Sequence, residues 1–251
     1  MRPLDLAHAL DPAAFMAACG LPPDPWQREF LRSPSRRSLL LCSRQSGKST
    51  VNAALATHHA LFSPGALVLL LAPGQRQTIE LFKKVLSFYR AVAPIDPDAE
   101  SAQRLELPNR SRIIALPGNA ETVRGYTPSL VIVDEAAFVP DDLYIALRPM
   151  LATQARGRFI ALSTPYGTRG WFHDAWCGGG KQWTRTRITA HDCPRISPAF
   201  LEEEREALPD HQFRSEYLCE WVDADTQFFP THLVRAAVTP DVKPLTLQLG
   251  W

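Results

Sequence analysis

Residues Ser43-Arg44-Gln45-Ser46-Gly47-Lys48-Ser49-Thr50 follow directly on the apolar run Ser38-Leu39-Leu40-Leu41-Cys42. An apolar run leading into such a segment predicts a strand, a phosphate-binding loop (P-loop) and then a helix. The backbone N–H groups of such a loop surround a polyphosphate, and the helix N-terminus points its positive end at the same anion. Lys48 would reach the β- and γ-phosphates, and the Ser49 hydroxyl would hold Mg²⁺. The usual motif begins with glycine, and Cys42 stands in that position here.

A second motif ends in two acids, because Leu130-Val131-Ile132-Val133 runs into Asp134-Glu135. A fully apolar run of this length predicts a strand buried on both faces of a parallel sheet. At its end, Asp134 could hold Mg²⁺, directly or through water, and Glu135 could polarise the attacking water. The alternative is a buried strand that ends in a solvated acidic turn. Since both motifs occur together and in this order, the sequence predicts that the chain binds and hydrolyses ATP.

The composition is that of an ordinary globular protein. The chain has 251 residues, of which 45% are hydrophobic and 21% charged, with a net charge of +1. That charge gives no argument for nucleic acid, and the arginine-rich basic set fits a GC-rich coding genome at least as well. No apolar run is long enough to cross a bilayer, and no signal segment is visible. We therefore expect an intracellular protein whose five widely spaced cysteines are reduced thiols.

The rest of the chain alternates strand and helix patterns. Strands are expected at 66–72 and 158–163, and an amphipathic helix at 75–92. A turn at 108–111 between two apolar segments predicts a hairpin. Such alternation predicts an α/β fold with a mainly parallel, doubly wound sheet.

The character of the sequence changes after Gly178-Gly179-Gly180. Residues 1–177 are expected to form the P-loop core with an N-terminal helical segment. Residues 178–240, which include an alternating segment at 181–188 and a charged helix at 198–208, are expected to form a small C-terminal lid subdomain.

Three motifs together resemble the ATPase domain of large terminase subunits, the motors that package DNA into tailed-phage heads. They are Ser43 to Thr50, Val133-Asp134-Glu135-Ala136 and Ser163-Thr164-Pro165; the later stretch from Gln212 to Trp221 is also similar to a terminase segment. The resemblance spans nearly the whole chain and implies a RecA/ASCE-like P-loop fold. A missing first glycine and an arginine within the loop are typical of that family.

The resemblance also implies roles for single residues. Trp26 and Gln27 look like the adenine-recognising element, although Gln27 could equally be an exposed helix residue. Arg44 would lean over the phosphates of its own subunit. Ser163 and Thr164 match the motif that senses the γ-phosphate, or else a plain exit from a strand. The expected nucleotide-binding set is Trp26, Gln27, Ser43, Gln45, Ser46, Gly47, Lys48, Ser49, Thr50, Ser163 and Thr164, with Ser49 and Asp134 for the metal.

Arg124 lies eleven residues before Glu135, on the loop that enters the acidic strand. In some terminases an arginine so placed reaches the ATP site of the neighbouring subunit. There it would offset charge on the transferred phosphoryl group, an effect worth roughly 10³–10⁵ in rate in other systems. The alternative is a surface arginine that pairs with Glu121. The expected catalytic set is thus Glu135, Lys48, Arg124 and Arg44.

The family resemblance implies partners as well. They are double-stranded DNA, further copies of the chain in a ring (a pentamer) on the capsid portal, and a small terminase subunit, in the host cytoplasm and without a membrane. Two other functions stay open: a helicase or remodelling ATPase, and a nucleotide-gated binding switch. A helicase needs a second core domain, and a switch does not need the water-polarising Glu135.

The end of the chain, Pro244 to Trp251, alternates apolar and polar residues like a strand. Large terminases continue from such a segment into an RNase H-like nuclease domain. We therefore expect 241–251 to be a linker and the start of a nuclease domain, with a natural C-terminal strand as the alternative. No nuclease carboxylate cluster can be assigned within this chain, so no DNA cleavage is expected from it.

Overall fold

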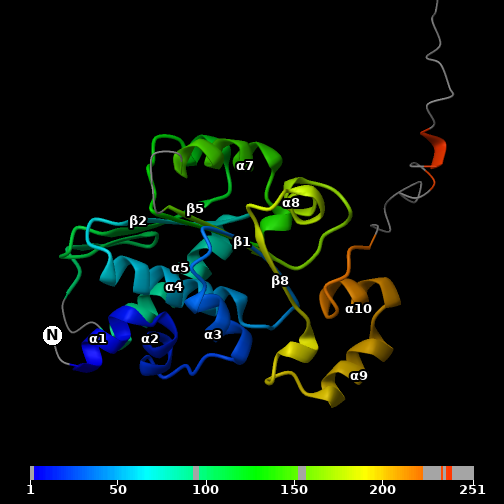
Figure 1. Ribbon diagram of the computed structural model, residues 1–251, viewed down its shortest axis with the longest axis horizontal. Coiled ribbons are helices and arrows are strands. Elements are labelled where there is room, and N and C mark those ends of the chain that lie inside the picture. Colours follow the sequence, from blue (N-terminus) through cyan, green and yellow to red (C-terminus); the bar gives the residue numbers. More distant parts are fainter. Residues whose placement is uncertain (1–2, 93–95, 152–156, 223–232, 234–235, 239–251) are drawn as a thin grey trace, which may run out of the picture.

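The structure, a computed structural model, describes residues 3–92, 96–151, 157–222, 233 and 236–238 (Figure 1). The expected linker and nuclease start at 241–251 lies outside the described residues. Among the helices that are described, none combines the length and the apolar character needed to span a membrane.

In the described part of the chain, one eight-stranded sheet has the order β3-β4-β5-β2-β6-β7-β1-β8. Its strands are β1 (Arg37–Cys42), β2 (Leu67–Ala72), β3 (Ala99–Glu100), β4 (Arg104–Glu106), β5 (Arg112–Pro117), β6 (Leu130–Asp134), β7 (Arg158–Ser163) and β8 (Thr184–Ile188). All neighbours from β5 to β8 pair in parallel, and β3 and β4 are antiparallel at one edge. The predicted α/β class with a mainly parallel sheet is confirmed, and β4 and β5 form the predicted hairpin.

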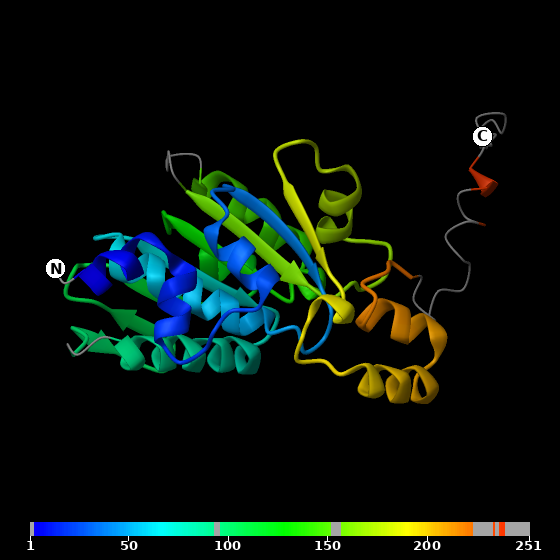
Figure 2. The same cartoon turned by 60° about the horizontal axis from the view of Figure 1, so that its bottom comes forward.

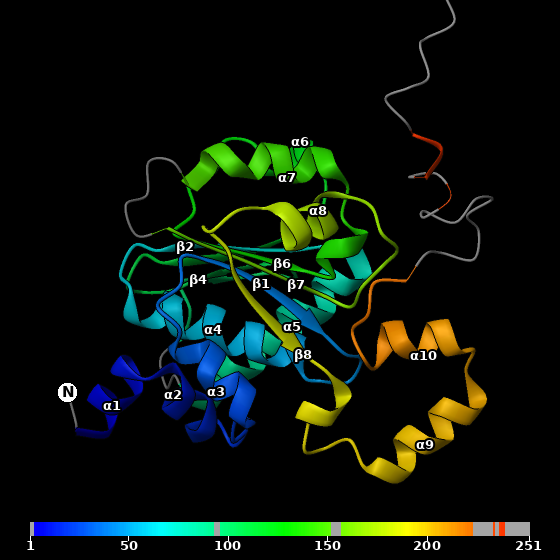
Figure 3. The same ribbon diagram turned by 45° about the vertical axis from the view of Figure 1, so that its right-hand side comes forward.

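The central strands are buried on both faces because helices cover both sides of the sheet. Since alternate residues of a strand point to opposite faces, Leu40 and Ile132 join one apolar cluster and Leu41 and Val133 join the other. On the first face lie α4 (Lys48–Phe62) and α5 (Gln75–Val92), and on the second lie α6 (Ala120–Val123), α7 (Asp141–Leu147) and α8 (Trp171–Gly178). Figures 1 and 3 show these two layers of helices on either side of the strands.

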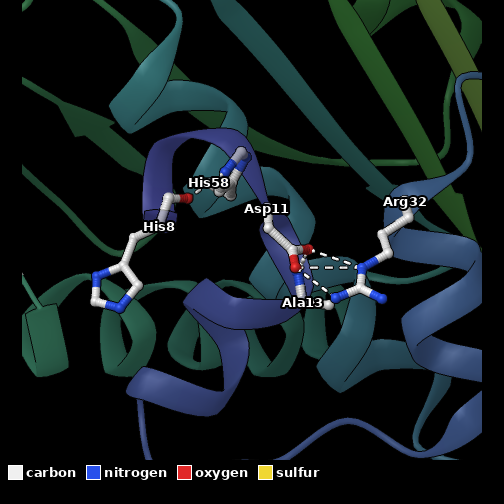
Figure 4. A network of polar contacts seen from close by, with 5 residues as sticks. All are labelled: His8, Asp11, Ala13, Arg32 and His58. Atoms are coloured by element: carbon white, nitrogen blue, oxygen red, sulfur yellow. Dashed lines mark hydrogen bonds and ion pairs between the residues drawn. The ribbon is translucent and has the colours of Figure 1, made fainter. Parts of the chain in front are cut away.

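The predicted N-terminal helical segment consists of α1 (Pro3–Leu10), α2 (Pro12–Ala18) and α3 (Pro25–Arg32). Apolar residues of α2 and α3 join the cluster beneath α4. Polar contacts fix the same helices (Figure 4): Arg32 pairs with Asp11, and the ring Nε2 of His58 on α4 lies 2.9 Å from the His8 carbonyl. The hydrogen bond from Arg32 lowers the pKa of Asp11 below its ordinary value. The apolar residues of α3 and the ion pair at its last residue, Arg32, thus hold this helix, which carries Gln27, against the core.

The C-terminal part begins within the sheet and then leaves it. β8 pairs in parallel with β1, so the alternating segment that the sequence placed in the small C-terminal subdomain is the edge strand of the sheet. After a short 3-10 turn at Ala190–Asp192 come α9 (Pro198–Ala207) and α10 (Asp210–Glu216). These two helices lie beyond one end of the sheet (Figure 2), around a small apolar cluster of their own. The helices outside the sheet thus follow Ile188, ten residues after the predicted start of the lid.

Three neighbouring parallel strands bring the predicted motifs together. β7 lies between β1 and β6, with Leu41 beside Ser163 and Asp134 beside Leu162. All three strands end at the same edge of the sheet, which is where ligands bind in open parallel sheets. The P-loop, the acidic pair and the Ser163-Thr164 motif therefore meet at one site.

Candidate active site

The loop between β1 and α4 has the conformation of an anion-binding cradle. α4 begins at Lys48, and the residue before it, Gly47, has a φ of 86°. Gln45 is also left-handed, with a φ of 57°. Such turns direct successive N–H groups to one side, and the Ser46 hydroxyl braces the loop by donating to the Ser43 carbonyl at 2.9 Å. The sequence prediction of a P-loop followed by a helix agrees with this local structure.

The first two N–H groups of the loop bond to the C-terminal part of the chain. Ser43 N–H donates to the Ile188 carbonyl at 2.8 Å, and Arg44 N–H donates to the Glu216 carbonyl at 2.9 Å. The loop is thus fixed to the end of β8 and to the last residue of α10 through backbone atoms.

Lys48 connects the P-loop to the acidic strand. Its Nζ lies 3.0 Å from Glu135 Oε1, and the two side chains are only 10% and 26% exposed. Burial by itself lowers the pKa of Lys48, but the carboxylates of Glu135 and Asp134 outweigh it and raise the pKa. Lys48 is therefore a firmly charged ammonium at the end of the loop.

Asp134 is buried beside Ser49, whose hydroxyl donates a hydrogen bond to its carboxylate. Burial, and then the charge of Glu135, raise the pKa of Asp134, while Lys48 and Ser49 act in the opposite direction. The two residues predicted to hold the metal are thus in contact.

The oxygens at this site fit a magnesium ion. Glu135 follows the strand in a left-handed conformation with a φ of 50°, and its Oε2 is buried and accepts no hydrogen bond from a described residue. Hard cations prefer such carboxylate and hydroxyl oxygens. No group of three or more His, Cys, Asp or Glu side chains among the described residues could hold a metal ion. A divalent cation here would therefore need further ligands, such as water and phosphate oxygens.

Gln27 lies directly under the P-loop. Its side chain is completely buried, so the alternative of an exposed helix residue is wrong. Its Oε1 accepts from the Asp24 N–H at 3.0 Å, and its Nε2 donates to the Ser46 carbonyl at 3.4 Å. The spacing of Asp24 and Gln27 matches a capping box, a sequence signal that accounts for the hydrogen bond between the Asp24 N–H and Gln27 Oε1. Its neighbour Trp26 is buried in the apolar cluster below.

Arg195, which the sequence analysis missed, also touches the loop. Its Nη2 donates to the Ser46 carbonyl at 3.0 Å and forms an ion pair with Asp24 Oδ2 at 2.8 Å. A Cβ at Gly47 would lie 2.7 Å from Arg195 Nη2 and 2.7 Å from Gln27 Nε2, so any larger residue here would have to displace both side chains and adopt a left-handed φ. Arg195 is 149 residues from Ser46 in the sequence, and no local pattern marks it.

Arg44 points toward the C-terminal helices in this structure. Its Nε pairs with Glu216 Oε2 at 2.8 Å, and its side chain is 62% exposed. The neighbouring Ser215 hydroxyl donates to the Pro165 carbonyl at 3.3 Å, just after the buried pair Ser163 and Thr164. The end of α10 therefore contacts both the P-loop and the motif after β7.

The sequence matches the family described as "Terminase large subunit, T4likevirus-type, N-terminal" over residues 39–235. The chain belongs to this terminase family. The matched residues include the P-loop, the acidic pair and both helices beyond the sheet.

Two curated relatives are also terminase large subunits. The terminase large subunits of Thermus virus P23-45 and Thermus phage G20c are 26% and 25% identical to the chain, each over 86% of it and 52% of the relative. The chain thus spans about half the length of these terminases.

Solved terminase structures have the same fold. The large terminase ATPase domain of Thermus phage P74-26 superposes with a TM-score of 0.71 at 25% identity, over 83% of this chain and 97% of that one. The large terminase of bacteriophage HK97 gives 0.68 at 17% identity, over 85% and 55%. The large terminase of a thermophilic bacteriophage, solved in complex with ADP, gives 0.63 at 12% identity, over 83% and 53%.

Two other predicted residues, Arg124 and Thr50, form no ion pair or side-chain hydrogen bond with Lys48, Asp134 or Glu135 among the described residues. Arg124 is exposed at the end of α6 and forms no ion pair with Glu121 or with any other described residue. Thr50, in the first turn of α4, faces a cavity of about 250 Å³ that is also lined by Leu21 and Phe88. Arg124 is thus free to contact another molecule.

Proposed function

We propose that this terminase domain hydrolyses ATP and that the hydrolysis drives double-stranded viral DNA into a procapsid. The observation that carries the proposal is the 3.0 Å contact between Lys48 Nζ and Glu135 Oε1. It puts a cation for the phosphates and a carboxylate for the attacking water in one place, beside Asp134 and Ser49. The shared fold with a terminase ATPase domain supports the proposal, as do structures of the thermophilic phage terminase with ADP and with ATPγS.

In the proposed reaction, Glu135 orients a water molecule in line with the γ-phosphate and accepts its proton. The water oxygen bonds to the γ-phosphorus as the bond to the β,γ-bridging oxygen breaks, and ADP leaves with the electron pair. Lys48 offsets negative charge on the phosphate oxygens. Ser49 and Asp134 would hold Mg²⁺, which when bound offsets further charge on the β- and γ-phosphates.

Other residues are proposed to bind and sense the nucleotide. The P-loop from Gln45 to Thr50 would receive the phosphates. To pair with the adenine beside Trp26, the buried Gln27 amide would have to leave the Asp24 N–H and the Ser46 carbonyl, which hold it in this structure. Arg44 would reach the phosphates by leaving Glu216. Ser163 and Thr164 would sense the γ-phosphate. Because Ser215 of α10 donates to the carbonyl of the following residue, Pro165, α10 would move with this segment.

Assembly would complete the site. Arg124 is proposed to reach the ATP site of a neighbouring copy in a ring, a pentamer on the capsid portal by family resemblance. Its exposure and its lack of an ion pair among described residues support this role. Double-stranded DNA and a small terminase subunit are the other proposed partners, in the host cytoplasm.

The test is phosphate release from ATP by the purified domain, over a range of protein concentrations and with Mg²⁺ or EDTA. Each condition is measured with double-stranded DNA, with single-stranded DNA and without DNA. We expect Mg²⁺-dependent turnover that rises more than linearly with protein concentration and increases with the duplex. Stimulation by single strands alone would favour a helicase, and binding without hydrolysis a switch. A protein that neither binds nor hydrolyses ATP would refute the proposed site.

A further inference from the structure

The Ser46 carbonyl accepts two side-chain hydrogen bonds from distant parts of the chain. Gln27 Nε2 on α3 lies 3.4 Å from the oxygen, and Arg195 Nη2 lies 3.0 Å from it. A carbonyl oxygen has two lone pairs, so both acceptor positions of this one are used.

These contacts set the direction of a P-loop N–H. A trans peptide is planar, so its C=O and N–H point in opposite directions. Holding the Ser46 carbonyl toward Gln27 and Arg195 turns the Gly47 N–H to the other side of the same peptide. That N–H immediately precedes Lys48, at the N-terminus of α4, where a phosphate would be bound.

The contacts also form a closed ring of four residues. Asp24 pairs with Arg195 at 2.8 Å, and its N–H donates to Gln27 Oε1 at 3.0 Å. Gln27 and Arg195 both donate to Ser46. A ring in which each member has two partners resists rotation of the Ser46–Gly47 peptide better than either hydrogen bond alone.

We propose that Arg195 is a positioning residue for polyphosphate binding: its guanidinium, fixed by Asp24, orients the Ser46–Gly47 peptide for the phosphates of a nucleoside di- or triphosphate. Arg195 acts through the peptide and does not touch the nucleoside. The inference rests on the proposed nucleotide site and adds to it a residue from the segment between the 3-10 turn and α9.

The experiment measures dissociation constants of the domain for ADP and for inorganic tripolyphosphate, by displacement of a fluorescent ADP analogue. Arg195→Gln is compared with Arg205→Gln, an exposed arginine of α9 without an ion pair among the described residues. Because a hydrogen bond from a charged donor is lost, both constants should rise about tenfold in Arg195→Gln and stay unchanged in the control. Thermal unfolding without ligand separates this effect from a loss of fold, and Arg195→Lys should recover part of the affinity.

A second variant keeps the inference testable if Arg195→Gln folds poorly. Asp24→Asn removes the ion pair while keeping a good helix N-cap, and it should weaken tripolyphosphate binding about threefold. If Arg195→Gln folds, Asp24→Asn should add little further loss in that background, since both act on one ring.

Several results would overturn the inference. They are unchanged affinity in Arg195→Gln, an equal loss in Arg205→Gln, or weaker ADP binding with unchanged tripolyphosphate binding, which would mean direct contact with the nucleoside. If the wild-type domain binds neither ligand, the proposed nucleotide site fails as well; if only the Arg195 effect is absent, the site stands without this inference.

Discussion

The substitution Glu135→Gln tests the centre of the proposed site, because it removes one charge and preserves shape. In the structure, Glu135 Oε1 is 3.0 Å from Lys48 Nζ in a largely buried ion pair. A γ-phosphate would have to compete with this carboxylate for the ammonium. A hydrogen bond between charged groups contributes about 1.5–3 kcal/mol, and a neutral amide acceptor contributes roughly half of that. The variant should therefore bind ATP about 3–10-fold more tightly, from roughly 1 kcal/mol less competition.

Hydrolysis should change in the opposite direction. Loss of a positioned general base typically reduces the rate about 10²–10⁴-fold. Nucleotide titration and single-turnover phosphate release measure the two effects separately, with Glu121→Gln on the exposed surface of α6 as a matched control. Turnover near the wild-type rate would show that another group positions the water. Weaker ATP binding would show that Glu135 does not compete for Lys48.

Three further predictions concern assembly, the loop and pH. Mixing Arg124→Ala, which should bind ATP but not hydrolyse it, with Lys48→Ala should restore phosphate release if Arg124 acts on a neighbouring copy; no recovery would exclude that role. Gly47→Ala should lower the free energy of unfolding by about 1–2 kcal/mol, because alanine is strained at a left-handed φ. Gly20→Ala should lower it by a similar amount, since Gly20 has a φ of 83° and open space where its Cβ would be. Only Gly47→Ala should also weaken ADP binding, and equal affinities of the two variants would contradict the close packing at this loop. Burial lowers the pKa of His59 from 6.5 to about 4, so its neutral form contributes stability above pH 6.5 that is lost as pH falls toward 4. Measured by urea denaturation, the free energy of unfolding of the wild type should fall about 2 kcal/mol more than that of His59→Asn between pH 7.5 and 5. Equal decreases in the two proteins would contradict the lowered pKa of His59.

The elements that the sequence predicted well are those with strong local patterns. β2 and β6 are runs of apolar residues, and such runs are stable only when buried on both faces. The amphipathic helix at 75–92 was predicted with the bounds that α5 has in the structure. The chemistry was readable for a similar reason, because the P-loop is one continuous segment and Asp134-Glu135 directly follows a strand.

Contacts between distant segments were beyond a single sequence. The alternation in β8 predicts a strand but does not say which strand it pairs with, and its place beside β1 depends on the whole sheet. No residue near Arg195 in the sequence indicates that its side chain hydrogen-bonds to the P-loop. The pairing of Arg44 with Glu216 likewise depends on how α10 packs, which local propensity does not determine.

The backbone contacts at the start of the P-loop limit how a nucleotide can be held. The amides of Ser43 and Arg44 already donate to Ile188 and Glu216. The backbone donors left for an incoming anion therefore begin at Gln45 and continue into the first turn of α4, which starts at Lys48. Since both hydrogen bonds join main-chain atoms, most side-chain substitutions at Ser43, Arg44, Ile188 and Glu216 would leave these two amides bonded within the protein.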